Sequence, residues 1–162
     1  MSSRLIGSFL LALMFALCAS SALAQMPNPY GAPISVDNAK KAAAAAVAEA
    51  RKNNWTMAVA VIDPGGTLVY FEKMDGTQTG SVNVALGKAR SAALYKRPTK
   101  VWQDIVAGGG AGLRILGLEG AVPIEGGLPL VVDGKIVGAI GVSGGSGQQD
   151  GQCATEGAAA VK

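Results

Sequence analysis

Residues 128–142 read LPLVVDGKIVGAIGV, and this stretch decides the fold class. Two apolar runs flank Asp133-Gly134, a dipeptide that is typical of the tight turn in a β-hairpin. We therefore predict two antiparallel strands, Leu128 to Val132 and Ile136 to Val142. A shorter apolar run just upstream, Ala121 to Ile124, predicts a further strand.

A second hairpin is expected earlier in the chain. The runs Thr56 to Asp63 and Thr67 to Met74 are β-branched and apolar, and Pro64-Gly65-Gly66 separates them. Between and around the hairpins the sequence favours helices, including five consecutive alanines from Ala42 to Ala46. Helices are predicted over Val36 to Lys52, Ser81 to Tyr95, Lys100 to Val106 and, from a weaker pattern, Ser146 to Lys162, with Ser35, Ser81 and Thr99 as N-caps of the first three.

The predicted order is helix, two strands, two helices, three strands and helix. Strands that follow one another in hairpins, with the helices grouped between them, indicate an α+β layer structure rather than βαβ units. We expect an antiparallel β-sheet of about five strands flanked by helices.

The N-terminal segment has the pattern of a secretory signal. Arg4 precedes an apolar run of 13 residues from Leu5 to Leu17, and Ala22-Leu23-Ala24 forms a small-residue cleavage site. The run is shorter than the roughly 20 residues that cross a bilayer. We therefore expect residues 1–24 to be a cleaved signal peptide, residues 25–34 an extended arm with three prolines, and residues 35–162 one domain of a periplasmic or secreted protein.

Composition excludes several classes of site. The chain has no histidine, so Ser-His-Asp triads, Cys-His pairs and histidine zinc sites are all excluded. Loss of the signal would remove Cys18 and leave Cys153 as the single cysteine. A net charge of +3 without long basic runs implies neither nucleic acid nor a membrane surface as partner. No catalytic residue is predicted, and the sequence leaves open whether the chain is an enzyme.

One helix face suggests a ligand site. At about 100° per residue, Lys88 shares a face with Ser81, Ala85 and Ala92, while Arg90 lies opposite. Small neighbours leave room beside Lys88 for a carboxylate, although a lysine that merely reaches solvent has the same pattern. Two glycine turns abut strand ends and expose backbone N–H groups, a geometry that suits anions but also ordinary turns. The predicted ligand site comprises Met74, Asp75, Lys88, Gly126, Gly127, Ser143 and Gly144, with Lys88 as the counter-charge.

Several short motifs carry a resemblance when they are taken in order. Asp63-Pro64-Gly65-Gly66, Met74-Asp75-Gly76, the run from Gly87 to Ala92, Gly126-Gly127-Leu128-Pro129, and the run from Gly138 to Gly145 with Asp150 resemble the GlcG/HbpS-like family, which includes the C-terminal domain of PduO. The resemblance covers residues 35 to 160. It implies a profilin-like sheet flanked by helices, assembly into dimers and often octamers, and haem binding in several members.

The absence of histidine sets this chain apart from relatives that are thought to use histidine toward haem or iron. Haem iron is also held by methionine, cysteine or tyrosine in other proteins. The resemblance therefore predicts an exported haem (tetrapyrrole)-binding protein, with redox sensing or haem handling as its role. The alternatives are an accessory protein that binds a small organic acid in glycolate or alcohol oxidation, and a structural oligomer without a ligand. Candidate iron ligands are Met74, Tyr95 and Cys153, together with Met57 and Tyr70, and Lys88 is the candidate partner of a propionate.

Overall fold

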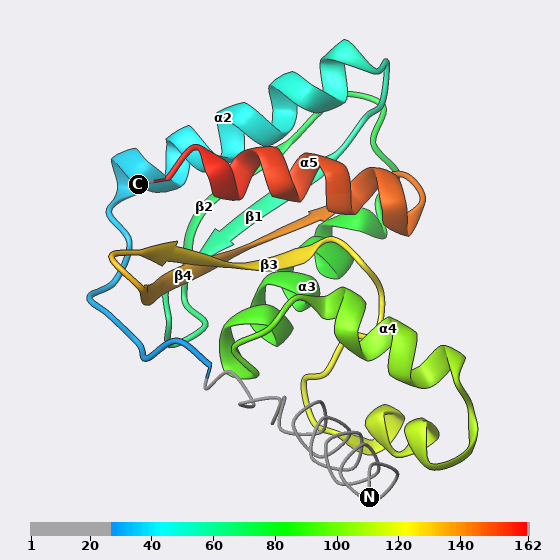
Figure 1. Ribbon diagram of the computed structural model, residues 1–162. Helices are drawn as coiled ribbons and strands as arrows, with labels where there is room; N and C mark the ends of the chain where they lie inside the picture. The colour runs from blue at the N-terminus through cyan, green and yellow to red at the C-terminus, as the bar shows by residue number, and fades with distance from the viewer. Residues whose placement is uncertain (1–26, 162) are drawn as a thin grey trace, which may run out of the picture.

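The computed structural model describes residues 27–161, so the expected signal peptide and the first two residues of the arm lie outside the described residues. A four-stranded antiparallel sheet runs through the molecule in the order β2-β1-β4-β3 (Figure 1). Both predicted hairpins are present. The β1–β2 hairpin forms one half of the sheet and the β3–β4 hairpin forms the other, with β1 and β4 adjacent in the middle. The strands are β1 Ala58–Ile62, β2 Leu68–Lys73, β3 Gly127–Val132 and β4 Lys135–Ser143.

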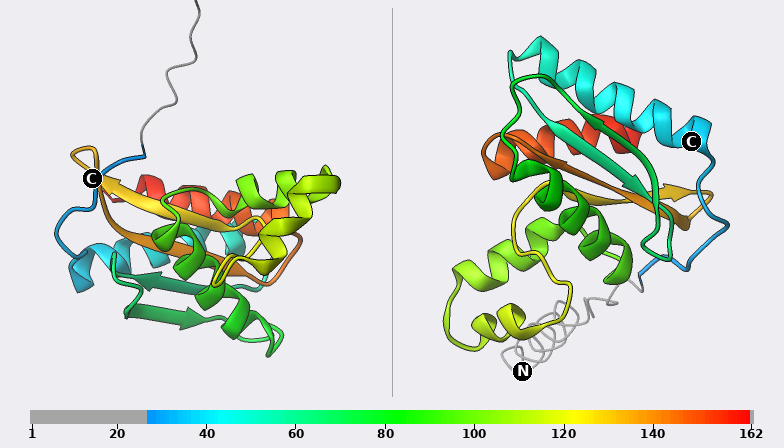
Figure 2. Two further views of the ribbon diagram at one scale, coloured as in Figure 1. Left: turned by 90° about the horizontal axis from the view of Figure 1, so that it is seen from below. Right: turned by 180° about the vertical axis from the view of Figure 1, so that it is seen from behind.

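Helices cover both faces of the sheet. Two of them, α2 and α5, lie side by side on one face, and α3 crosses the other face (Figures 1 and 2). Beyond α3, α4 and the 3₁₀ helix η1 project from the body of the molecule. The helices are α2 Val36–Lys52, α3 Ser81–Leu94, α4 Thr99–Ala107, η1 Gly110–Gly117 and α5 Gly147–Ala159.

The central strand β1 separates two apolar cores. Its five residues are all fully buried, and alternate side chains point to opposite faces of the sheet. Val59 and Val61 pack with the alanines of α2, whereas Ala58 and Ala60 pack with those of α3. Small side chains on both elements allow α3 to lie very close to the sheet, so that a Cβ on Gly141 would collide with the Ala85 carbonyl.

The predicted fold class, an α+β structure with an antiparallel sheet flanked by helices, is confirmed, but the strand count is four rather than about five. The segment from Ala121 to Ile124 joins no strand. Its Val122 N–H donates to the Ser91 hydroxyl on α3 at 3.0 Å, so a side chain replaces a strand partner. Pro123 has no N–H to offer to a ladder.

Two predicted N-caps are also wrong. Gly80 and Pro98 occupy the N-cap positions of α3 and α4, and neither helix has a side-chain cap. Ser81 and Thr99 begin the helices instead, and their hydroxyls bond to residues of other elements. Ser35, by contrast, caps α2 as predicted, because its side chain accepts from the Asn38 N–H.

The described part of the arm, residues 27–34, follows β4 beyond the point where β1 ends. Gly31 and Ile34 donate to the carbonyls of Ile136 and Val137, each at 2.8 Å. Tyr30 then reaches across and donates its hydroxyl to the Ala93 carbonyl of α3 at 2.9 Å. Within residues 27–161, no helix combines the length and the apolar character needed to cross a membrane.

Candidate functional site

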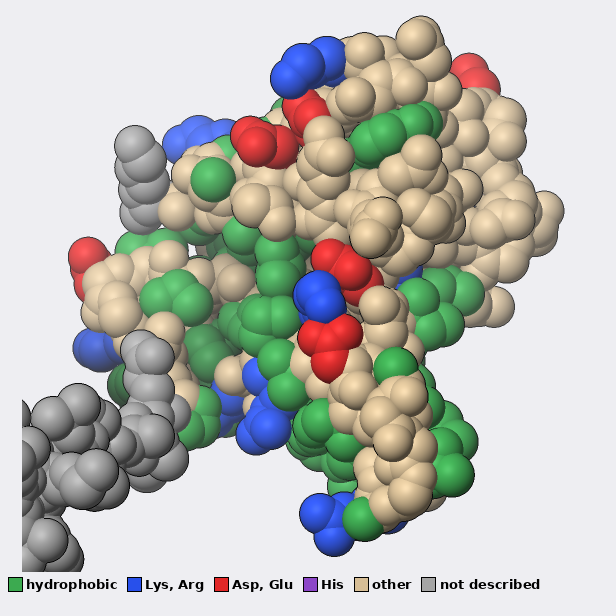
Figure 3. Space-filling view, turned by 45° about the vertical axis from the view of Figure 1, so that its right-hand side comes forward, with side chains coloured by type: hydrophobic (Ala, Val, Ile, Leu, Met, Phe, Trp, Pro, Cys, Tyr) green, Lys and Arg blue, Asp and Glu red, His purple; other side chains and the backbone are tan. Residues whose placement is uncertain are grey.

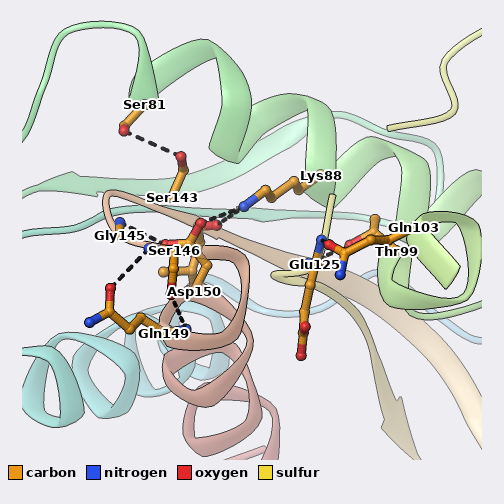
Figure 4. A network of polar contacts seen from close by, with 12 residues as sticks. Ser81, Lys88, Thr99, Gln103, Glu125, Ser143, Gly145, Ser146, Gln149 and Asp150 are labelled. Carbon is orange, nitrogen blue, oxygen red and sulfur yellow. Dashed lines mark hydrogen bonds and ion pairs between the residues drawn. The ribbon is translucent and has the colours of Figure 1, made fainter. Parts of the chain in front are cut away.

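The centre of the predicted site is a buried ion pair between α3 and α5. The Lys88 ammonium lies 2.6 Å from Asp150 Oδ2 and donates to the Val142 carbonyl at 3.0 Å (Figure 4). Both side chains are almost wholly buried, at 0% and 3% exposure. The carboxylate that lies beside Lys88 comes from the chain itself, so the lysine predicted as the counter-charge of a ligand already has a partner.

Asp150 is positioned by the first turn of α5. Ser146 and Gln149 form a capping box at the start of this helix, and an acidic side chain is favoured at a helix N-terminus. The second carboxylate oxygen, Oδ1, accepts from the Gly145 N–H at 3.0 Å. Asp150 therefore joins the helix, the preceding glycine turn and Lys88.

Burial opposes the charge on both partners. Burial lowers the pKa of the Lys88 ammonium, and the nearby Asp150 and Glu125 carboxylates counteract this effect. Burial likewise raises the pKa of Asp150, against the opposing effects of Lys88 and of the Gly145 and Gly144 N–H groups. Each charge thus depends on its partner, and removal of either one would leave the other buried without compensation.

The first glycine turn is pressed against this pair. Gly126 has a φ of 122°, and a Cβ there would lie 2.9 Å from Lys88 Nζ and 2.7 Å from the Val142 carbonyl oxygen. The neighbouring N–H groups are used by α4, because Gly127 donates to Thr99 Oγ1 at 2.9 Å and Glu125 donates to Gln103 Oε1 at 2.8 Å. The N–H groups of Glu125 and Gly127 are therefore already bonded to side chains of α4 and are not open to a ligand.

The predicted site residues are brought together in part. Lys88, Gly126 and Gly127 form the buried core of the group, and Ser143, on β4, bonds to Ser81 at 3.2 Å. A Cβ on Gly144 would collide with the Thr56 carbonyl and the Met57 sulfur. At the margin, Met74 is partly buried and accepts the Met57 N–H, and Asp75 is exposed. Of the seven residues predicted to form a ligand site, the structure therefore groups five around the ion pair and leaves Met74 and Asp75 at its edge.

This buried network does not fit a tetrapyrrole. A macrocycle with two carboxylates needs an open apolar surface and cations whose charge is available. Lys88 already has Asp150 as its counter-ion, and a ligand carboxylate would have to displace that group. A haem site is therefore expected among residues outside the Lys88–Asp150 network.

A second group of residues lies where α3 ends. Tyr95 packs edge-on against Trp102 with ring centroids 5.5 Å apart. The Arg97 guanidinium lies 4.6 Å from the centre of the Trp102 ring, and the Lys96 ammonium lies 4.2 Å from that of Tyr30. We call Leu94, Tyr95, Lys96, Arg97, Trp102 and the adjoining segment 118–120 the Tyr95 corner.

The Tyr95 corner has features that suit an apolar anion. Leu94 is 50% exposed and Leu118 is 38% exposed. Neither Lys96 nor Arg97 forms a salt bridge to a carboxylate within residues 27–161. Lys96 has a φ of 53°, a left-handed conformation that is unfavourable for a lysine, and the indole N–H of Trp102 is buried without a partner.

Exposed apolar side chains continue from this corner onto the projecting helices. Figure 3 shows hydrophobic side chains on the lower part of the molecule, with Lys and Arg side chains nearby. Val101 and Ile105 are one turn apart on α4, so they lie on the same face of that helix. The large apolar residues exposed in this region are Leu94, Val101, Ile105, Leu113, Leu116, Leu118 and Ile124.

Sequence reasoning missed the roles of Asp150, Arg97 and Thr99. A lysine among alanines indicates a nearby carboxylate, and Asp150 stands in the first turn of α5, where an acidic side chain is favoured. Lys96 and Arg97 follow Tyr95 directly in the sequence. The rings that these cations contact, Tyr30 and Trp102, come from other segments, so the sequence alone does not reveal the pairing. The described residues contain no group of three or more His, Cys, Asp or Glu side chains that could hold a metal ion.

Comparison with known proteins supports a relationship over most of the chain. Residues 34–159 match the family model described as "Haem degrading protein HbpS-like". Protein GlcG of Escherichia coli K12 is 42% identical over 100 residues, which cover 62% of this chain and 73% of GlcG.

Solved structures agree with this relationship. A double mutant of HbpS from Streptomyces reticuli superimposes with a TM-score of 0.74 at 32% identity, covering 82% of this chain and 89% of that chain. The haem complex of PduOC gives a TM-score of 0.72 at 30% identity, covering 80% of this chain and 96% of that chain.

Proposed function

The chain belongs to the HbpS-like family, and we propose that it is an exported protein that binds haem at the Tyr95 corner. A similar fold in complex with haem, PduOC, supports haem as the ligand. The secretory pattern of residues 1–24 supports export, and haem handling or haem-dependent redox sensing outside the cytoplasm is the role that we propose.

The observation that carries the location is the combination of apolar surface and available cations. Haem presents a flat apolar macrocycle and two propionates. Leu94 and Leu118 offer exposed apolar contact, and Lys96 and Arg97 offer positive charge within three residues of Leu94. The indole N–H of Trp102 is buried without a hydrogen-bond partner at the same place. It would donate to a ligand carboxylate once the side chains that cover it move aside.

Titration of the purified protein with hemin tests the proposal. We expect a saturable shift of the Soret band. Leu94→Glu should weaken hemin binding by about 10- to 100-fold, because it removes an apolar contact worth roughly 1.5–3 kcal/mol and places a carboxylate beside the propionates. Leu68→Glu is the matched control, since Leu68 is similarly exposed at 45% but lies on β2, and its affinity should equal that of the wild type.

The two cations are tested in the same assay. Replacing both Lys96 and Arg97 with glutamate should weaken binding by at least tenfold, because a charge-assisted contact contributes roughly 1.5–3 kcal/mol. Arg90→Glu is the control, because Arg90 is an exposed cation of α3 that bonds to Gly66 in the β1–β2 turn. A wild-type protein that gives no saturable Soret shift does not bind haem, and calorimetry with glycolate would then test the organic-acid alternative. Equal binding by all variants would place haem elsewhere on the protein.

A further inference from the structure

A chain without histidine must offer haem iron another donor, and the structure separates the candidates. Methionine sulfur, cysteine thiolate and tyrosine phenolate all serve as axial ligands of haem iron. Within residues 27–161 these donors are Met57, Met74, Cys153 and three tyrosines. The ligand must reach the iron from an open apolar surface, because the macrocycle cannot enter a packed core.

Two of the donors are sealed inside the protein. Cys153 and Met57 have no exposed surface and belong to the core between the sheet and the α2–α5 layer. Burial also raises the pKa of the Cys153 thiol to about 12, so that the thiolate that iron requires is not formed near neutral pH. Neither side chain can meet a macrocycle without unfolding this core.

Three further donors are engaged elsewhere. The Met74 sulfur packs against the same core and accepts the Met57 N–H at 3.4 Å. Tyr70 donates to Glu72, and burial together with that carboxylate raises the pKa of the phenol, which disfavours a phenolate. Tyr30 donates to the carbonyls of Ala93 and Leu94 and so ties the arm to α3.

Tyr95 resembles Tyr30 in donating to a backbone carbonyl, but it has one acceptor rather than two, and its bond is exposed whereas the shorter of the two Tyr30 bonds is partly buried. Tyr95 is partly exposed and follows the exposed Leu94 in the chain, and its hydroxyl donates to the Glu119 carbonyl at the surface. The Arg97 side chain folds back, so that its Nε donates to the Tyr95 carbonyl at 2.9 Å. The same guanidinium lies over the Trp102 ring, so Arg97 is a cation of the Tyr95 corner.

We infer that Tyr95 supplies the axial oxygen ligand to haem iron at the Tyr95 corner, an inference that rests on the proposed haem function. The Tyr95 hydroxyl releases its hydrogen bond to Glu119 and gives its proton to solvent. Its oxygen then takes one axial position of ferric hemin, from which a water molecule leaves. No electron is transferred in this exchange.

Spectroscopy of the hemin-loaded protein tests the ligand directly. The wild type should show the phenolate-to-iron charge-transfer absorption and the phenolate vibrations of a tyrosine-ligated ferric haem in resonance Raman spectra. Tyr95→Phe should lose both signatures and bind hemin at least tenfold more weakly. Tyr70→Phe is the matched control, and it should keep the signatures and the affinity of the wild type.

A histidine at the same position gives an independent readout. Tyr95→His should still bind hemin but show the spectrum of a nitrogen-ligated haem, a gain of signal that loss of folding cannot imitate. If the wild type binds hemin and both Tyr95 variants keep its spectrum unchanged, the inference is wrong while the proposed function stands. If the wild type binds no hemin, the proposed function fails first and the inference fails with it.

Discussion

Among single residues, Lys88 and Asp150 have the largest expected effect on stability. Lys88→Met would leave the Asp150 carboxylate buried without its partner, and breaking a buried pair costs about 3–5 kcal/mol. Combining Lys88→Met with Asp150→Asn removes both charges and should restore most of that loss. Urea unfolding curves at pH 7 measure these differences.

The exposed pair Lys100–Asp104 is the matched control for this experiment. Its side chains are 51% and 59% exposed, so Lys100→Met should cost less than about 1 kcal/mol. The pH dependence has a defined sign: burial raises the folded-state pKa of Asp150, so the folded state of Lys88→Met binds a proton more tightly than the unfolded state does. This variant should be more stable at pH 4 than at pH 7, and equal stability at both would contradict the assignment.

At the scale of an element, the turn between residues 124 and 127 connects α4 to the ion pair. Gly126→Ala combines a disfavoured φ of 122° with collisions against Val142, Asp150 and Lys88. Gly134→Ala, in the β3–β4 turn, has a φ of 71° but meets no atom within 4 Å. We expect about 1–2 kcal/mol of destabilisation for Gly134→Ala and about 1–3 kcal/mol more for Gly126→Ala.

Thermal unfolding of the two glycine variants measures this difference. Both substitutions strain the backbone, but Gly126 has the less accessible φ and also meets the ion pair and the β4 carbonyl, so both effects make Gly126→Ala the more costly change. Equal melting temperatures would mean that the turn around Gly126 adjusts easily and that the pair is less tightly enclosed than the structure shows.

For the whole molecule, we predict export and self-association. Expression of all 162 residues in a secreting host should give a subunit that begins at Gln25, and native mass spectrometry should show at least a dimer. The exposed apolar face of α4 favours contact with a second copy. Ile105→Glu should shift the assembly toward monomer, because it places a charge in that contact.

Val36→Glu is the control, since Val36 is also exposed, at 50%, but lies at the start of α2 on the other face of the sheet. It should leave the assembly unchanged. A monomeric wild type, or a subunit mass that retains residues 1–24, would rule out the corresponding part of the prediction.

The sequence alone determined the local structure, because local patterns depend on neighbouring residues. Asp133 and Gly134 both have positive φ values, as the tight turn requires. The period of α3 placed Lys88 and Arg90 on opposite faces, and the structure buries Lys88 and exposes Arg90. The antiparallel sheet with helices on it followed from the order of the hairpins and helices.

Tertiary packing alone decided which distant residues meet. Lys88 and Asp150 are 62 residues apart, and no periodicity links them. The stretch from Ala121 to Ile124 has the composition of a strand but does not form one. Its Val122 N–H donates to the hydroxyl of Ser91 on α3 instead of to a neighbouring strand. The Tyr95 corner likewise combines the end of α3, α4 and the segment after η1, and the arm contacts it through Tyr30. Its surface exists only after folding, because the free energy that brings these segments together comes from burial of the alanine-rich cores elsewhere in the molecule.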